Sequence, residues 1–137
     1  MGRVSALKAL QAGLIVAAML PARQALAFDL NGAWASQRDF CDRVFTKKGG
    51  TMEFAEMSDL YGSGFIVNGD SIKAKAAKCT INSRRQDGDV TVLNASCATQ
   101  IMTSELQFSY KSINDNTLLR SFPDIEGMTL QYSRCPM

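Results

Sequence analysis

Short runs of alternating apolar and polar residues recur along the chain from Asp29 to Cys135. In the run 104–113, apolar side chains occupy every second position from Leu106 to Tyr110. A period of two is typical of a β-strand with one buried face. Turn residues separate eight such runs, at 29–35, 51–56, 63–67, 71–85, 90–100, 104–113, 117–122 and 128–135. This spacing predicts an all-β domain, a small antiparallel up-and-down barrel of about eight strands, with a β-sandwich as the alternative.

The strands on either side of Asp87-Gly88 form the clearest predicted hairpin. Asp-Gly between two β-type runs favours a tight turn, because glycine adopts a positive φ without a Cβ clash. The apolar positions of the first run change parity at Ala76-Ala77, which predicts a β-bulge there. Folding the two runs about Gly88 places Cys79 opposite Cys97, close enough for a disulfide.

One short helix is expected near the start of the domain. Ser36 and Asp39 have the S-x-x-D spacing of a helix N-terminus. Apolar residues then follow at helical spacing, and the run 47–50, KKGG, has the cations and glycines that favour a helix C-terminus. The apolar stripe consists of Phe40, Cys41, Val44 and Phe45.

Residues 1–27 have the pattern of a secretory signal peptide. A basic start precedes the apolar run 9–20, and Ala25-Leu26-Ala27 is typical of a cleavage site. The apolar run is too short to span a bilayer, so we expect no membrane span after cleavage. Removing 27 of the 137 residues leaves 110, which form one predicted domain, 28–137. We expect a periplasmic or secreted monomer.

The signal peptide also accounts for the apparent positive charge. The chain has 15 Lys and Arg residues and 13 Asp and Glu residues. Arg3, Lys8 and Arg23 leave with the signal, so 12 basic residues remain against 13 acidic ones, a net charge of −1. This balance gives no reason to expect a nucleic acid or an anionic membrane as a partner. The densest basic group, at 73–78, is expected to form a soluble outer face, with a docking patch for an acidic partner as the alternative.

All four cysteines lie in the predicted mature domain. An even number in a small exported domain predicts two disulfides. Four cysteines allow three pairings, and the hairpin register favours Cys79–Cys97, which leaves Cys41–Cys135. The second bridge would bring the first element next to the last strand. That favours a closed barrel, because closure removes exposed strand edges.

Gly32-Ala33-Trp34, on the first predicted strand, resembles the G-x-W signature of calycin-type barrels, which include lipocalins, avidin-like proteins and bacterial secreted metalloprotease inhibitors. The resemblance implies that Trp34 plugs the closed end of the barrel and that Arg134, on the last strand, lies across it. The stretch 61–64, YGSG, is similar to the Ser/Gly loop that periplasmic lysozyme inhibitors place in their target. Taken together, the stretch 28–34, FDLNGAW, the Cys-containing helix and the stretch 122–135, FPDIEGMTLQYSRC, resemble small uncharacterised exported proteins of alphaproteobacteria, a group without a known activity.

Catalysis by histidine is excluded, because the sequence contains no His. This removes Ser-His-Asp and Cys-His sites and His-ligated metals, and we expect no cofactor or metal. Paired carboxylates remain, and Glu53, Glu56 and Asp59 form the densest acidic group. Neighbouring acids on one strand and loop do not face each other across a cleft, as glycoside hydrolysis would require. An enzyme that uses such a pair is therefore a distant third hypothesis.

A binding module is the preferred interpretation, and it has two forms. In the first, a lipocalin-like barrel carries a small apolar ligand in a cavity of a few hundred cubic ångströms. A barrel filled by Phe54, Phe65, Leu106 and Phe108 would contradict it. Methionines are expected mainly in the core, with an adaptable apolar site as the alternative. They are Met52, Met57, Met102 and Met128.

The second form is an inhibitor or interaction module that binds a protein partner through its loops. Rigid scaffolds commonly present function on loops, and the candidates here are 57–64 and 123–127. The candidate contact residues of the first loop are Asp59, Leu60, Tyr61 and Ser63.

Overall fold

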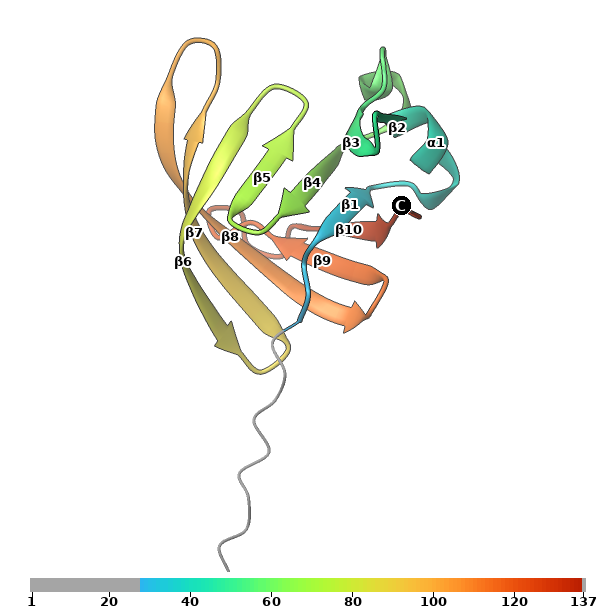
Figure 1. The fold of residues 1–137 in the computed structure, drawn as a ribbon. Helices are drawn as coiled ribbons and strands as arrows, with labels where there is room; N and C mark the ends of the chain where they lie inside the picture. The colour runs from blue at the N-terminus through green and yellow to red at the C-terminus, as the bar shows by residue number, and fades with distance from the viewer. Residues whose placement is uncertain (1–27, 137) are drawn as a thin grey trace, which may run out of the picture.

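Eight strands close into one antiparallel barrel, which confirms the predicted fold class (Figure 1). The computed structural model describes residues 28–136, so the predicted signal peptide at residues 1–27 lies outside the described residues. The order around the ring is β1 (Gly32–Ala35), β10 (Thr129–Arg134), β9 (Thr117–Ser121), β8 (Thr103–Asn114), β7 (Val90–Ala98), β6 (Lys78–Asp87), β5 (Ser71–Ala74) and β4 (Gly64–Asn68). Strand β4 pairs with β1 and closes the ring.

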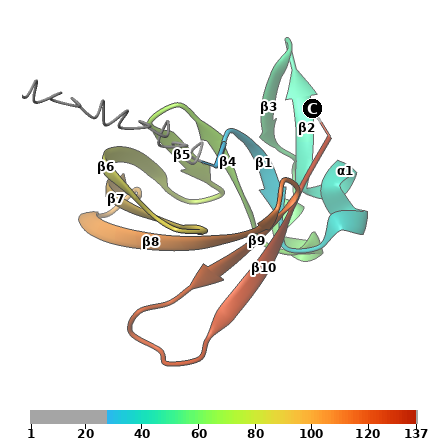
Figure 2. The same ribbon diagram turned by 90° about the horizontal axis from the view of Figure 1, so that it is seen from below.

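The chain leaves the ring once, between β1 and β4. From β4 to β10, consecutive strands are neighbours, which is the up-and-down arrangement. The excursion consists of η1 (Arg38–Phe40), α1 (Cys41–Val44), the hairpin of β2 (Phe45–Lys48) and β3 (Thr51–Phe54), and η2 (Ser58–Tyr61). Figures 1 and 2 show α1 and the β2–β3 hairpin outside the ring, beside β1.

The predicted helix is shorter than expected, because its second half is a strand. The α-helical turn ends at Val44, and residues 45–48 continue as β2. Gly49 and Gly50 have positive φ angles of 59° and 81° and form the turn of the β2–β3 hairpin. A Gly-Gly pair suits such a turn as well as it suits a helix end.

The bulge predicted at Ala76-Ala77 is wrong, because the chain reverses direction there. Strand β5 ends at Ala74 and β6 begins at Lys78, and Ile72 lies opposite Cys79 in the antiparallel pair. A reversal changes the parity of the inward positions just as an inserted residue does. The run 71–85 therefore supplies two barrel strands in place of one.

The predicted number of barrel strands is correct because two errors cancel. The run 71–85 was expected to form one strand and contains parts of β5 and β6. The run 51–56 was expected in the barrel, but it forms β3, which pairs only with β2 in the side hairpin.

The register of the β6–β7 hairpin depends on a bulge that lies elsewhere. Next to the turn, Asp87 lies opposite Val90, whereas the predicted pairing about Gly88 would place it opposite Asp89. A bulge between Ile81 and Ser83 then shifts the pairing by one residue, so Cys79 lies opposite Cys97 as predicted.

Both predicted disulfides are confirmed. Cys79–Cys97 joins β6 to β7 inside the barrel wall, and Cys41–Cys135 attaches α1 to the chain just after β10. Two disulfides are typical of an extracytoplasmic protein. Within residues 28–136, no helix is long and apolar enough to cross a membrane.

Apolar side chains form two cores. The larger core lies inside the barrel and contains the fully buried Trp34, Leu93 and Leu118. The smaller core lies between β1 and the excursion, where Val44 and Phe45 pack with residues that include Ala33, Ala35 and Cys135. Strand β1 therefore contributes alternate residues to both cores, which explains why all four of its residues are buried.

Candidate functional site

The two ends of the barrel differ in how they are closed. Consecutive strands are antiparallel, so alternate turns lie at opposite ends. The β4–β5, β6–β7 and β8–β9 turns lie at one end, and the β5–β6, β7–β8 and β9–β10 loops lie at the other. We call these the closed end and the open end.

Trp34 and Arg134 seal the closed end. The indole of Trp34 is fully buried, and its Nε1 donates a hydrogen bond to the carbonyl oxygen of Leu30 at 2.9 Å. The guanidinium of Arg134 lies 4.3 Å from the centroid of the Trp34 ring. It also donates to the carbonyl oxygens of Asp29, Asn31 and Asp115. This is the arrangement that the G-x-W resemblance implied for these two side chains.

Glycine at position 32 makes room for this arginine. Gly32 has a positive φ of 126°, and a Cβ there would lie 3.1 Å from Nη1 of Arg134. Both the backbone conformation and the space therefore favour glycine.

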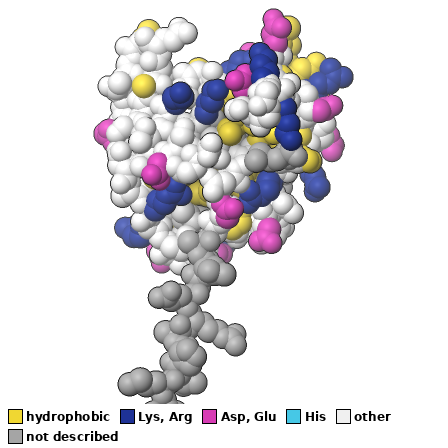
Figure 3. Space-filling view, viewed as in Figure 1, with side chains coloured by type: hydrophobic (Ala, Val, Ile, Leu, Met, Phe, Trp, Pro, Cys, Tyr) yellow, Lys and Arg dark blue, Asp and Glu magenta, His cyan; other side chains and the backbone are white. Residues whose placement is uncertain are grey.

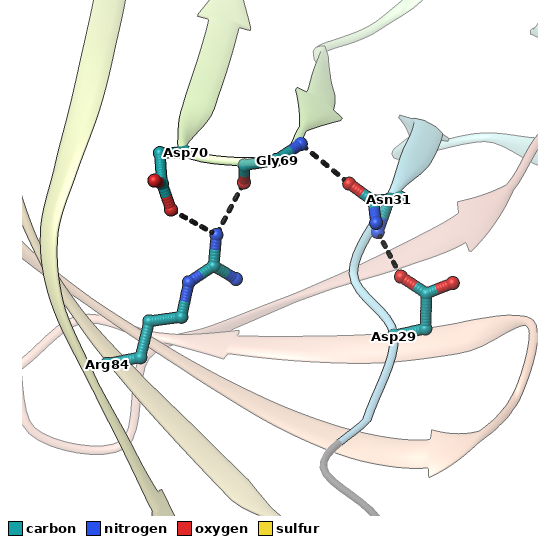
Figure 4. Close-up of polar contacts among 5 residues, drawn as sticks. All are labelled: Asp29, Asn31, Gly69, Asp70 and Arg84. Carbon is teal, nitrogen blue, oxygen red and sulfur yellow. Dashed lines mark hydrogen bonds and ion pairs between the residues drawn. The ribbon is translucent and has the colours of Figure 1, made fainter.

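Polar contacts tie the N-terminal segment to the β4–β5 turn at the closed end (Figure 4). The Asn31 side-chain oxygen accepts a hydrogen bond from Gly69 N–H at 2.8 Å, and Asn31 N–H donates to Asp29 at 2.9 Å. Arg84 donates to the Gly69 carbonyl and lies 3.0 Å from the Asp70 carboxylate. The Asn31 contact therefore holds the segment before β1 against this turn, and Arg84 attaches the same turn to β6.

A cavity of about 680 Å³ occupies the open half of the barrel. Its lining is mainly apolar, and its wall includes the Cys79–Cys97 disulfide and the aromatic rings of Phe65, Phe108 and Tyr110. Phe65 also contacts Tyr132 edge-on, with ring centroids 5.0 Å apart, so these rings form a fixed aromatic layer. The aromatic side chains therefore border the cavity and do not fill it.

Arg120 brings a positive charge to this apolar wall. It lies opposite Tyr110 in the β8–β9 ladder, so its side chain points inward like that of Tyr110. The guanidinium lies 4.9 Å from the ring centroid of Phe108 and 4.6 Å from that of Phe122. Burial raises the pKa of the Tyr110 hydroxyl, while the Arg120 charge acts in the opposite direction. The phenol is therefore neutral at physiological pH.

The predicted loop 57–64 forms part of the cavity rim. Five of its residues line the cavity: Ser58, Asp59, Gly62, Ser63 and Gly64. Lys75 holds this loop against the β5–β6 turn, because its Nζ donates to the buried Ser58 hydroxyl at 2.8 Å and lies 3.6 Å from the Asp59 carboxylate. The loop and the cavity, expected to serve alternative functions, lie at one site.

The four candidate contact residues of this loop have different environments. Leu60 projects into solvent, with 67% of its surface exposed, and Asp59 and Ser63 are also exposed. Tyr61 packs against Phe40, with ring centroids 5.6 Å apart, and belongs to the smaller core. Tyr61 is therefore a structural contact, whereas Leu60 is available at the surface.

The second predicted loop, 123–127, borders a neighbouring hollow of about 520 Å³ at the open end. Arg120 and Phe108 line both this hollow and the main cavity. The expectation that the methionines fill the core is wrong for three of the four. Met57 and Met102 are more than half exposed, and Met128 is 41% exposed; Met52 packs against the smaller core.

Two of the three acids in the predicted acidic group have a lysine partner at the surface. Glu53 lies 4.0 Å from Lys48, and Asp59 lies 3.6 Å from Lys75. Basic and acidic side chains are interspersed on the face shown in Figure 3. The basic group at 73–78 is divided between β5, the turn and β6, with Lys75 directed to the rim.

Sequence reasoning missed Arg120, although a signal was present. Leu118 and Arg120 occupy successive inward positions of β9, and Phe122 continues the same parity just after the strand ends. A cation at an inward position of an otherwise apolar strand face is unusual. That observation could have marked Arg120 before the structure was known.

The fold and site together define a closed antiparallel barrel with Trp34 and Arg134 across one end and a mainly apolar cavity in the other half. Comparisons with protein-family models, with curated proteins and with solved structures find no match to this chain. The cavity and the side chains that line it are therefore the features that bear on function.

Proposed function

We propose that this protein is an exported, non-catalytic carrier that holds a small apolar ligand in the cavity at the open end. The observation that supports this most directly is the 680 Å³ cavity with a mainly apolar lining. Ligand sites of drug-sized molecules occupy roughly 300–1,000 Å³ and are lined in the same way.

The architecture around the cavity supports the same proposal. Trp34 and Arg134 lie across the closed end, and the cavity lies in the other half of the barrel, where the loop 57–64 forms part of its rim. The side chains expected to fill a barrel without a ligand line the cavity instead, and they are Phe54, Phe65, Leu106 and Phe108. Export to the periplasm or the exterior is supported by the two disulfides and by the signal-like pattern of residues 1–27.

The proposal is tested by filling the cavity with a side chain. Ser104 lines the cavity from β8, whereas Ser109 lies on the opposite face of the same strand. We expect Ser104→Trp to abolish binding of N-phenyl-1-naphthylamine, a neutral apolar fluorophore, without loss of the fold. Ser109→Trp is the matched control and should bind like the wild type.

Equal fluorophore binding by both variants and the wild type would show that the cavity is not the site. Native mass spectrometry of protein purified from the periplasm gives a second test. A discrete bound mass that leaves on gentle activation is expected for a carrier. Its absence from both purified protein and protein incubated with apolar ligands would contradict the proposal.

A second function, binding of a protein partner through the open-end loops, is favoured by a specific observation. Three different loops carry exposed apolar side chains there: Met57 and Leu60, Ile101 and Met102, and Ile125 and Met128. Substituting Leu60 and Ile125 by Glu should then abolish cross-linking to a partner in the periplasm. The control, Ile113→Glu, places the same change on an exposed residue near the β8–β9 turn and should leave cross-linking intact.

A further inference from the structure

Three arginines point toward the barrel axis, and two of them have polar partners. Arg134 lies opposite Trp34, and Arg84 lies opposite Leu93, both inward-facing residues. Arg134 donates to three backbone carbonyls, and Arg84 pairs with a backbone carbonyl and a carboxylate. Both therefore have structural partners at the closed end.

Arg120 is different. Among residues 28–136, it has no carboxylate within ion-pair distance, and the groups that flank it are the rings of Phe108 and Phe122. Cation–π contacts offset part of the cost of removing a guanidinium from water. They leave its N–H donors free to bind an acceptor in the plane of the group.

The other charges on the cavity wall do not compete for this role. Within the described residues, the charged side chains of the lining are Asp59, Lys75 and Arg120. Asp59 and Lys75 pair with each other at the rim, at 3.6 Å. Among the described residues of this lining, Arg120 is thus the one charge without an ion-pair partner, and a half-buried cation in an apolar wall favours an anion. Glu105 and Asp124 line the neighbouring hollow, but neither forms an ion pair with Arg120.

We propose that the ligand is a single-chain amphiphile with an anionic headgroup, and that Arg120 binds this headgroup while the apolar tail occupies the cavity. The inference rests on the carrier function proposed above and specifies its ligand class. Carboxylates and phosphates match the planar fork of a guanidinium, which can bind two oxygens of one headgroup at once.

The position of Arg120 agrees with such an amphiphile. Arg120 borders both the main cavity and the neighbouring hollow, so a headgroup there lies near the mouth while the tail extends toward Phe65, Ile72 and the disulfide. The neutral Tyr110 hydroxyl, opposite Arg120 in the ladder, adds no charge that would repel an anion.

The test compares ligands of one chain length that differ in the headgroup. Dissociation constants for laurate, lauryl phosphate and 1-dodecanol are measured by displacement of the neutral fluorophore at fixed ionic strength. We expect the wild type to bind an anionic ligand about ten- to a hundredfold more tightly than the alcohol, as charge-assisted hydrogen bonds would give. Whichever of laurate and lauryl phosphate has the lower dissociation constant shows whether a carboxylate or a phosphate headgroup is preferred.

Variants then assign the preference to one residue. Arg120→Gln should bind laurate and 1-dodecanol about equally, with the affinity for the alcohol retained. Arg120→Lys should keep part of the preference, because it retains the charge without the planar fork. Arg85→Gln removes the same charge from the outer face of β6 and should leave the preference unchanged. Circular dichroism confirms that each variant is folded.

Failure of this inference is distinguishable from failure of the carrier function. If no apolar ligand displaces the fluorophore, or if the fluorophore itself does not bind, the carrier function is wrong. If 1-dodecanol binds but neither anion is preferred, only the headgroup assignment is wrong. The assignment is also overturned if Arg85→Gln reduces the preference as much as Arg120→Gln, because the attraction would then be a general charge effect.

Discussion

Truncation of Trp34 tests whether the closed end depends on its indole plug. Trp34 is fully buried, donates a hydrogen bond to Leu30 at 2.9 Å and carries the Arg134 guanidinium 4.3 Å from its ring. Replacing a buried Trp by Ala costs about 3–5 kcal/mol through lost burial and the cavity that remains. Loss of the hydrogen bond and the cation–π contact places Trp34→Ala in the upper half of that range.

Trp34→Phe separates the components of this loss. Phenylalanine keeps a ring beneath Arg134 but loses the indole N–H and part of the volume, so we expect about 1–2 kcal/mol. This variant also keeps the test informative if the alanine variant does not fold, since domains of this size are stable by only about 5–15 kcal/mol.

The assay is guanidinium chloride unfolding of the oxidised protein, followed by circular dichroism. Trp34 is the only Trp in the chain, so its fluorescence cannot report on variants that lack it. A loss below about 1 kcal/mol for Trp34→Ala would refute the plug, because it would mean that the indole contributes little burial. Trp34 is not part of the open cavity wall, so Trp34→Phe should bind the apolar fluorophore like the wild type.

Three further changes test other parts of the structure. Substituting Cys79 and Cys97 by Ser opens a loop with a sequence separation of 18, and urea unfolding should show a loss of about 2–4 kcal/mol. Gly64→Ala would place a Cβ 2.8 Å from both the Phe45 ring and the Trp34 carbonyl oxygen, so thermal unfolding should show about 1–3 kcal/mol of destabilisation. Burial raises the pKa of Tyr110 above 10.0, so above that pH the unfolded chain loses a proton that the folded protein keeps. The contribution of Tyr110 to the free energy of unfolding therefore falls as the pH rises. In urea unfolding measured at several pH values above that pH, Tyr110→Phe should make the fall in stability shallower by up to about 1.4 kcal/mol per pH unit.

The parts of the fold that the sequence predicts well are those in which one face of a strand is buried. In β7 and β8, apolar side chains stand at every second position because alternate residues point into the barrel. The Asp87-Gly88 turn locates the hairpin, but Cys79 lies opposite Cys97 only because of the bulge between Ile81 and Ser83, which the sequence did not predict. Period and turn chemistry are local properties, so the sequence alone expresses them.

The β5–β6 reversal was not predictable in the same way, because it lacks a turn signal. Residues 75–77 are Lys-Ala-Ala, without Gly, Pro, Asn or Asp, and a parity change there fits a bulge equally well. The tertiary cause is the pairing of β5 with both β4 and β6, which the sequence does not encode as a local pattern. The KKGG run is a similar case, since β2 is held by its pairing with β3.

The candidate site was predictable only in outline. The sequence indicated an apolar interior and a candidate loop at 57–64, but a cavity depends on how far the ring closes and on which aromatic rings meet across it. The expected core positions of the methionines failed for a related reason. Met57, Met102 and Met128 lie in or beside loops at the open end, where the strand parity that would have buried them no longer applies.

A barrel of this size that keeps an open cavity needs stability from another source than dense packing. An unfilled cavity forfeits dispersion contacts, and small domains already bury a modest share of their surface. The two disulfides act mainly on the unfolded chain, so they stabilise the barrel without occupying its interior. Cys79–Cys97 lies in the cavity wall itself, and Cys41–Cys135 anchors the excursion beside β1. One disulfide in the wall, one at the excursion and polar contacts at the closed end therefore stabilise the fold, so Arg120 and the aromatic rings of the open half remain available for the ligand that we propose.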